Sequence, residues 1–167
     1  MKIKTLKCII ALLIIFSCPQ LSINIKQATA LQAALTNKDM QDIQKVIDKS
    51  LSGFAANNID DIMETISPDY SKSIGGAIIN YAGLKELVEK NSADFFTDHI
   101  SCSLSDIKIL SSNIVSNKVT IKYEYTFRVF NKASFRWENY GFIQEFTFIK
   151  ENGNWKIITS GDKKALF

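Results

Sequence analysis

Apolar and polar residues alternate most regularly between Lys118 and Phe130. Every second residue from Val119 to Val129 is apolar, and polar or charged residues stand between them. Neighbouring side chains on a β-strand point to opposite faces, so this pattern predicts an antiparallel strand with one buried and one polar face. Its length is unusual for a strand.

A second alternating stretch follows over residues 140–149, with aromatic residues on one face. Its other face holds Ile143 and Ile149 and is therefore only partly polar. Because apolar positions on the surface of a sheet favour contact with a partner, we expect two copies to pack through this face as a homodimer. The stretches 100–110 and 154–159 complete a sheet of at least four strands.

Helical periodicity dominates the part of the chain before these strands. Apolar residues recur every three or four positions over residues 37–57, and a second short helix, capped by Asn58, ends before Pro68. A third helix is expected from Gly83, after a glycine-broken stretch, residues 71–80, that is typical of a short irregular strand or lid. Helices followed by antiparallel strands predict an α+β fold with the helices on one side of the sheet.

The start of the chain has the pattern of a secretory signal peptide. A basic opening, MKIKTLK, precedes an apolar run from Cys8 to Cys18 that is shorter than a membrane-spanning helix. We expect a signal peptide over residues 1–30, cleaved after Ala30, and an exported protein, periplasmic or extracellular. The alternative is lipidation at Cys18, and a lipidated Cys18 or an uncleaved leader would place the protein on a membrane.

Length and charge narrow the remaining possibilities. A chain of 167 residues with 46% hydrophobic content suffices for one core. We place this domain over residues 39–167, after a short linker over residues 31–38. The formal charge of +3 comes from the leader, since residues 31–167 hold 16 basic and 17 acidic residues. This balance argues against nucleic-acid binding, which needs clustered positive charge.

Neither a cofactor nor a metal is expected. One histidine and, after cleavage, one cysteine cannot form a usual zinc site, and no glycine-rich phosphate loop follows a strand. The remaining thiol, Cys102, has no second cysteine with which to form an internal disulfide, so the core must stabilise the fold.

Several short motifs follow one another between residues 40 and 160. A polar turn, Asn58 to Asp60, precedes the second helix, and the pair Asp69-Tyr70 follows it. Gly83 opens the third helix, and the last hairpin reads NGNWKII. In this order and spacing the chain resembles the nuclear transport factor 2-like superfamily, which has a cystatin-like fold, and within it the SnoaL-like bacterial proteins.

The resemblance implies a cone-shaped, strongly curved sheet wrapped on three helices, with a pocket between them. The superfamily includes isomerases, cyclases, dehydratases and epoxide hydrolases, and also members that only bind ligands or form assemblies. Its enzymes need a carboxylate or histidine that projects into an apolar cavity, where burial shifts the pKa of that group.

The candidates for catalysis are His99, Asp69 and Tyr70. His99 would be a general base oriented by Asp98, but neighbouring residues on a strand point to opposite faces, so this pairing requires a loop. Asp69 and Tyr70 would place an acid and a hydroxyl at the pocket mouth, although a turn after Pro68 and core packing explain them equally. His99 and Asp69 lie at element ends, where polar side chains are usually exposed.

The candidates for ligand binding are aromatic. Tyr123, Tyr125 and Phe127 share the apolar face of the long strand, and the resemblance implies that this face looks into the pocket. Tyr70 and Phe146 complete the set. These residues would either line a pocket and offer hydroxyl groups to a ligand, or fill the core.

The chain departs from many enzymes of the superfamily after its last long strand. These enzymes carry His or Asp just beyond the Trp-x-Ile motif, where this chain reads TSGDKK, with Ser160 and Gly161. We therefore expect an exported, non-catalytic binding or assembly domain with a small apolar pocket. The alternative is a cofactor-independent lyase or isomerase acting on a small apolar substrate. A carboxylate in the pocket would favour that alternative.

Overall fold

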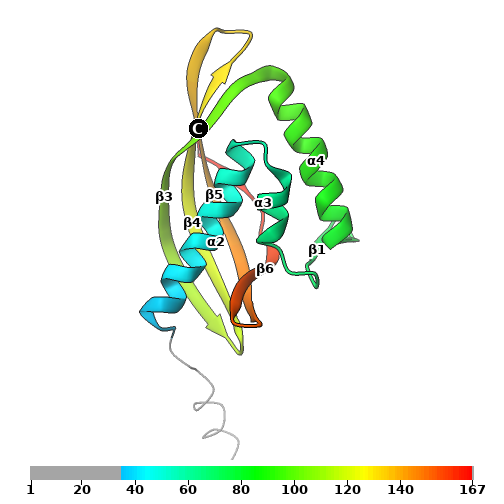
Figure 1. Ribbon diagram of the computed structural model, residues 1–167, viewed down its shortest axis with the longest axis vertical. Helices are drawn as coiled ribbons and strands as arrows, with labels where there is room; N and C mark the ends of the chain where they lie inside the picture. Colours follow the sequence, from blue (N-terminus) through cyan, green and yellow to red (C-terminus); the bar gives the residue numbers. More distant parts are fainter. Residues whose placement is uncertain (1–34, 167) are drawn as a thin grey trace, which may run out of the picture. The chain divides into compact units, whose positions relative to one another are not determined.

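The computed structural model describes residues 35–166, so the expected leader and Cys18 lie outside the described part of the chain. Three helices and a hairpin come first: α2 Asn37–Ala55, α3 Ile59–Glu64, β1 Ser71–Ile74, β2 Ala77–Asn80 and α4 Tyr81–Asp98. The sheet follows: β3 His99–Val115, β4 Lys118–Asn131, β5 Arg136–Glu151, β6 Asn154–Ser160 and β7 Lys164–Ala165. The predicted α+β order of helices followed by strands is confirmed (Figure 1).

The main sheet has the order β3-β4-β5-β6, and every neighbouring pair in it is antiparallel. The short β7 pairs with β5, beside β6. On β4 the apolar residues at alternate positions, from Val119 to Val129, are all buried. The alternation of the sequence therefore gave the correct inward face of this strand.

Helix α2 is fixed at its start by side-chain capping. The hydroxyl of Thr36 accepts a hydrogen bond from the backbone N–H of Asp39, and the Asp39 carboxylate accepts one from the backbone N–H of Thr36. This reciprocal arrangement satisfies two N–H groups that would otherwise lack helical partners. At the other end, Asn57 takes a positive φ of 55°, and Asn58 then caps α3 by accepting from the N–H of Asp61.

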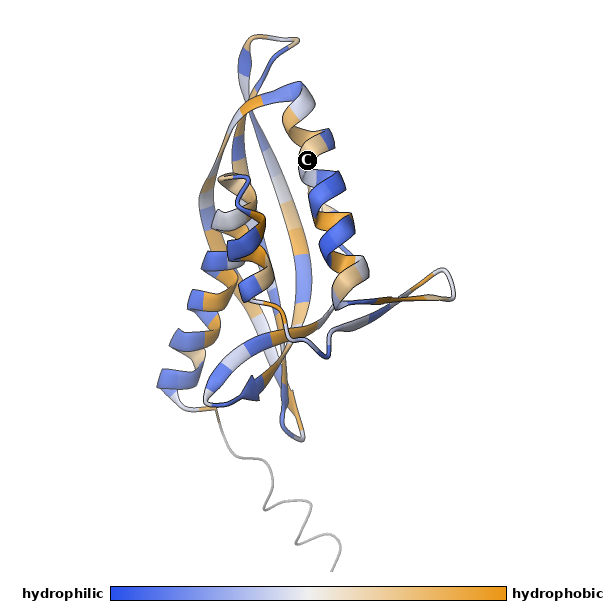
Figure 2. Ribbon diagram, turned by 45° about the vertical axis from the view of Figure 1, so that its right-hand side comes forward, coloured by the Kyte–Doolittle hydropathy of each residue, from blue (hydrophilic) through white to orange (hydrophobic). Residues whose placement is uncertain are grey.

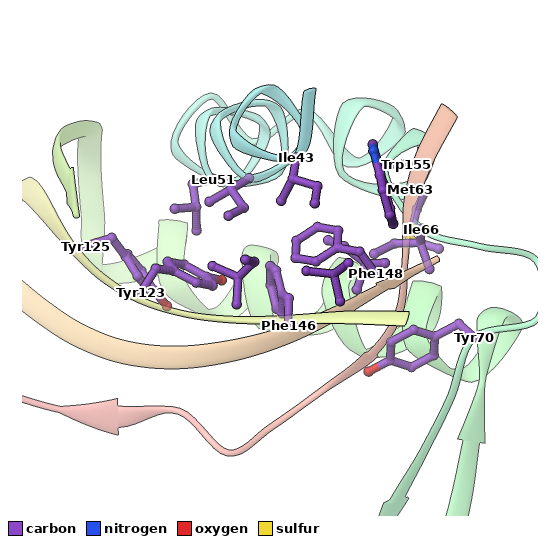
Figure 3. Packing of buried hydrophobic residues seen from close by; sticks show 14 of the residues in the cluster. Ile43, Leu51, Met63, Ile66, Tyr70, Tyr123, Tyr125, Phe146, Phe148 and Trp155 are labelled. Atoms are coloured by element: carbon purple, nitrogen blue, oxygen red, sulfur yellow. The ribbon is translucent and has the colours of Figure 1, made fainter. Parts of the chain in front are cut away.

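The core lies between α2, α3 and the inner face of the sheet. Ile43 and Ile47 of α2 and Phe148 of β5 are completely buried. Figure 3 shows the two layers meeting, with Leu51 of α2 above the aromatic residues of the strands. Burying a side chain of this size contributes about 1.5–3 kcal/mol relative to leaving it exposed. The core can therefore stabilise residues 35–166, where the single cysteine, Cys102, is a free thiol.

Helix α4 packs differently from α2. It begins at Tyr81, two residues before the predicted Gly83, because the side chain of Asn80 caps it by accepting from the N–H of Gly83. Only Ser92 of this helix is buried, and it donates a hydrogen bond to Asn57. The apolar residues of α4 are thus only partly buried, and Tyr81, Leu84 and Phe95 pack against the edge of the core.

The glycine-broken stretch forms a regular antiparallel hairpin, β1–β2, rather than an irregular strand. Gly75 and Gly76 make its turn with positive φ angles of 57° and 85°, a combination that glycine adopts at little cost. The hairpin extends away from the sheet (Figure 2), and Ile78 near its tip is 74% exposed.

Strand β3 is an edge strand that contains three bulges. The register with β4 shifts at Ile100, Ser105 and Leu110, each an extra residue without a partner across the pair. The hydroxyl of Ser105 donates to the carbonyl of Thr126, which anchors the middle bulge. After each extra residue, the inward-facing positions change from even to odd residue numbers or back. Leu104 and Ile107, three residues apart, therefore lie on the same side of the sheet.

Over residues 35–166, we find no helix long and apolar enough to cross a membrane.

Candidate ligand-binding site

A cavity of about 380 Å³ lies where α4 faces the inner side of the sheet. Its volume is within the usual range for small-molecule sites. Residues from all three helices, from β4, β5 and β6, and from the C-terminal segment line it. The lining side chains that the following argument uses are Phe54, Tyr70, Phe95, Tyr125, Phe127, Gln144, Phe146, Ser160 and Lys163.

The aromatic wall of this cavity follows from the alternation on β4 and β5. Tyr125 and Phe127 occupy successive inward positions of β4, with ring centroids 5.5 Å apart and nearly perpendicular planes. Phe54 of α2 meets Phe127 with a centroid separation of 5.5 Å and Phe95 of α4 with 5.2 Å. Such tilted contacts are favourable for aromatic pairs and hold the wall in place.

A second cavity of about 280 Å³ adjoins the first. The two share four lining residues, Phe54, Phe95, Phe127 and Lys163, while the second also has His99, Tyr140 and Phe142. The shared side chains make the two spaces neighbouring compartments of one site.

Two pairs of polar side chains lie in the larger cavity. The hydroxyls of Tyr70 and Ser160 are 2.9 Å apart, and Tyr125 donates to Oε1 of Gln144 at 3.2 Å. Burial raises the pKa of Tyr70, partly offset by the hydrogen bond with Ser160, and burial also raises the pKa of Tyr125. Both phenols are therefore neutral hydrogen-bonding groups at physiological pH.

Lys163 places a positive charge at the junction of the two cavities. Lys163 is an exposed residue, its Nζ lies 4.4 Å from the ring centroid of Phe142, and its side chain lines both spaces. Desolvation among these apolar groups lowers the pKa of Lys163. Within the described chain the ammonium has no carboxylate within salt-bridge distance.

No aspartate or glutamate of residues 35–166 lines either cavity. The titratable side chains there are Lys163, His99 and three tyrosines, Tyr70, Tyr125 and Tyr140. A carboxylate general base of the kind that the superfamily's enzymes use therefore has no counterpart in this site.

His99 is held by the end of α4 rather than by Asp98. Its Nδ1 lies 2.7 Å from the carbonyl oxygen of Phe95, and its ring stacks on the Phe95 ring with a centroid distance of 4.3 Å. A carbonyl oxygen can only accept, so Nδ1 carries the proton and Nε2 is the basic nitrogen of the neutral ring. This stacking leaves His99 half-buried rather than exposed, with a hydrogen-bond partner for Nδ1.

The other predicted residues divide into two groups. Tyr70, Tyr125, Phe127 and Phe146 line the larger cavity. Tyr123 is completely buried beside Tyr125 and lines neither cavity (Figure 3). Its hydroxyl has no hydrogen-bond partner among the residues that the structure describes, and burial raises the pKa of Tyr123.

Asp69 is exposed and lies outside both cavities. Its backbone N–H donates to the hydroxyl of Ser67, in agreement with a turn after Pro68. The side chain of Asp69 is thus exposed to solvent, whereas its neighbour Tyr70 lines the larger cavity.

Lys163 was missed by reasoning from the sequence. It stands in the TSGDKK segment, where the sequence analysis looked for histidine or aspartate and weighed no lysine. Nothing in the alternation of apolar residues distinguishes Lys163 from the adjacent Lys164. The two differ only through the short strand β7, which pairs Lys164 with Ile143 and so determines how the segment runs along β5.

The described residues contain no group of three His, Cys, Asp or Glu side chains that could hold a metal ion.

Solved structures with the same fold include proteins with very different descriptions. One described as a dehydratase of the nuclear transport factor 2-like family, from Streptomyces avermitilis, has a TM-score of 0.61 at 6% identity and covers 79% of this chain and 99% of its own. A ketosteroid isomerase-like protein from Erwinia carotovora gives 0.58 at 14% identity, with coverages of 79% and 99%. A calcium/calmodulin-dependent protein kinase type II association domain from Thiobacillus denitrificans gives 0.57 at 12% identity, with coverages of 74% and 94%.

These likenesses confirm the nuclear transport factor 2-like fold and show nothing further about function. No curated protein matches the sequence. Residues 45–166 match the model of the family described as the C-terminal domain of the anti-sigma-I factor RsgI9.

Proposed function

The chain belongs to the family of the C-terminal domain of the anti-sigma-I factor RsgI9, and from this premise we propose that it is an exported domain that binds a small apolar molecule without transforming it. The observation that carries this proposal is the lining of the cavity. Aromatic and aliphatic side chains form most of its walls, a few hydroxyl and amide groups and the ammonium of Lys163 interrupt them, and no carboxylate of residues 35–166 lies among them. This composition is typical of a binding pocket.

The position of α4 supports the same function. Its apolar residues Leu84, Val88 and Phe95 line the cavity instead of being sealed in the core. A ligand in the cavity would cover apolar surface that the protein leaves accessible, and each square ångström removed from water contributes about 25 cal/mol. We also propose that the sheet curves around this space as the family resemblance implies.

Export is supported by the sequence alone. The basic opening and the short apolar run are those of a secretory signal, so the ligand would be met outside the cytoplasm. Lipidation at Cys18 stays the alternative and would keep the domain at a membrane surface.

A cavity-filling substitution tests the binding function. Val88→Trp should fill the larger cavity and abolish the binding of 1-octanol, a neutral apolar probe, measured by isothermal titration calorimetry. Lys85→Trp, on the same helix but outside the cavity lining, is the matched control and should bind as the parent does. If Val88→Trp, folded by circular dichroism, bound octanol as tightly as the parent, the cavity would not be the site.

One observation favours a lyase or isomerase as the second candidate. His99 lines the smaller cavity with Nδ1 engaged by a carbonyl, which leaves Nε2 as a basic nitrogen. A histidine in this state can remove a proton from a bound substrate if Nε2 reaches it. Some proteins of the same fold are named as enzymes, so this alternative needs its own experiment.

A further inference from the structure

Among residues 35–166, no carboxylate matches the charge of Lys163 in a site whose other lining groups are neutral or aromatic apart from His99. The ring of Phe142 lies 4.4 Å from its Nζ and stabilises the ammonium through its π-face, but the ring does not neutralise the charge. The sequence neighbour Asp162 does not serve Lys163, because its carboxylate pairs with Lys72 at 3.4 Å.

The surroundings of Lys163 favour a negatively charged guest. Neither cavity is lined by aspartate or glutamate of the described chain, so an anion would meet no repelling carboxylate there. A cation would meet the ammonium itself. Lys163 is an exposed residue beside apolar groups, so an anion should be preferred over a neutral or cationic guest, with part of the attraction screened by water.

A second donor lies on the same wall. Gln144 accepts the hydroxyl hydrogen of Tyr125 through Oε1, which leaves its amide NH₂ free to donate. Gln144 and Phe142 are two residues apart on β5, so both face the cavity side on which the Lys163 ammonium lies. An ammonium and an amide are suited to the two oxygens of one carboxylate.

We propose that the ligand is an amphipathic monocarboxylate, with its carboxylate bound by Lys163 and Gln144 and its apolar body lying against the aromatic wall of the larger cavity. This assignment rests on the proposed binding function and names the chemical class of its ligand. It places the charged end at the junction of the cavities and the tail towards Tyr125, Phe127 and Phe146.

Octanoate, 1-octanol and octylamine test the assignment because they share one tail and differ in the head group. Calorimetry on the purified protein should show octanoate binding at least tenfold more tightly than octanol, and octylamine more weakly than octanol. Lys163→Met keeps much of the side-chain length and removes the charge, so it should lower octanoate affinity at least tenfold and octanol affinity much less. Lys164→Met, one residue further on and outside both cavities, should change neither.

The outcomes separate this assignment from the binding function itself. If octanol binds and Val88→Trp blocks it, but octanoate binds no more tightly than octanol, the pocket stands and the carboxylate assignment is overturned. Equal losses for octanol and octanoate in Lys163→Met would also overturn it. If none of the three probes binds the parent protein, both proposals fail.

Discussion

Trp155 donates a hydrogen bond from its indole Nε1 to Oδ1 of Asp39 at 3.1 Å, across 116 positions of the sequence. The same oxygen accepts from Nζ of Lys150 at 2.8 Å. Asp39 also belongs to the capping box of α2, so one carboxylate joins the first turn of this helix to the last hairpin of the sheet. The side chain is only 17% exposed, which strengthens these contacts relative to those of a surface pair.

Two substitutions at Trp155 separate packing from hydrogen bonding. Trp155→Ala should lower the free energy of unfolding by about 3–5 kcal/mol, because it removes a buried aromatic ring from the core. Trp155→Phe keeps most of the ring and loses the indole N–H, so it should cost about 1 kcal/mol. Urea unfolding monitored by far-ultraviolet circular dichroism measures both. Equal losses for the two variants would contradict the packing role.

The carboxylate of Asp39 should make stability depend on acid. Hydrogen bonds, first from Lys150 and then from Thr36, hold the pKa of Asp39 well below its ordinary value of 3.8. A lowered folded-state pKa stabilises the protein fully above about pH 4, and this contribution is lost as the pH falls further and Asp39 becomes protonated.

Asp39→Asn should therefore lower stability by about 1 kcal/mol at pH 7 and less at pH 2–3. Thermal unfolding between pH 2 and pH 7 measures the difference between parent and variant. Asp94→Asn, a change at an exposed acid of α4, is the matched control. The stability difference between the parent and this variant should not become smaller at low pH. A difference that stayed constant over the whole range would contradict the assignment.

The three-helix order, the inward face of β4 and the final hairpin could be predicted from the sequence because each depends on local periodicity. The bulge at Ser105 could have been found as well. The core-facing residues of β3 stand at the even positions 102 and 104 and then at the odd positions 107 and 109, and an extra residue between them explains this change. The cavity could not be found in this way. The apolar stripe of α4 has the same pattern whether it meets side chains or an open space.

Catalysis by His99 can be tested separately from its structural role. His99→Ala should lower the free energy of unfolding by about 1–2 kcal/mol, because it removes a ring stacked on Phe95 and a hydrogen bond. Asp69→Asn should have almost no effect, because Asp69 is exposed. Thermal unfolding measures both changes.

A screen of the parent protein against steroid, polyketide-like and epoxide substrates should show no turnover if the domain only binds. Turnover in the parent that disappears in His99→Gln, with binding of 1-octanol and thermal stability retained, would establish the enzyme instead. His99→Gln tests catalysis more specifically than His99→Ala, because glutamine keeps a polar side chain and removes the basic nitrogen.

The homodimer is still a prediction, and the residues on the outer face of the sheet determine which variant tests it. Ile143 and Ile149 are half-buried there, and the nearby Lys122 and Glu145 form an ion pair at 3.9 Å. If two sheets pack through this face, Ile143→Glu should convert a dimer to a monomer at micromolar concentration, because it would bury an unpaired charge. Light scattering measures the mass.

Asn139→Glu, on the same face of β5 and four residues from Ile143, is the control for the added charge. A parent protein that is monomeric throughout, or a dimer that Ile143→Glu leaves intact, would exclude this interface.

The three bulges of β3 have a consequence for how copies of the protein can meet. A free strand edge recruits another strand only if the two backbones keep step, and extra residues at Ile100, Ser105 and Leu110 interrupt that step every five positions. An incoming strand would need matching insertions at the same intervals. Lateral growth by strand addition, the route to fibrils, should therefore be disfavoured along β3, although β3 is a long strand with no strand neighbour on its outer side among residues 35–166.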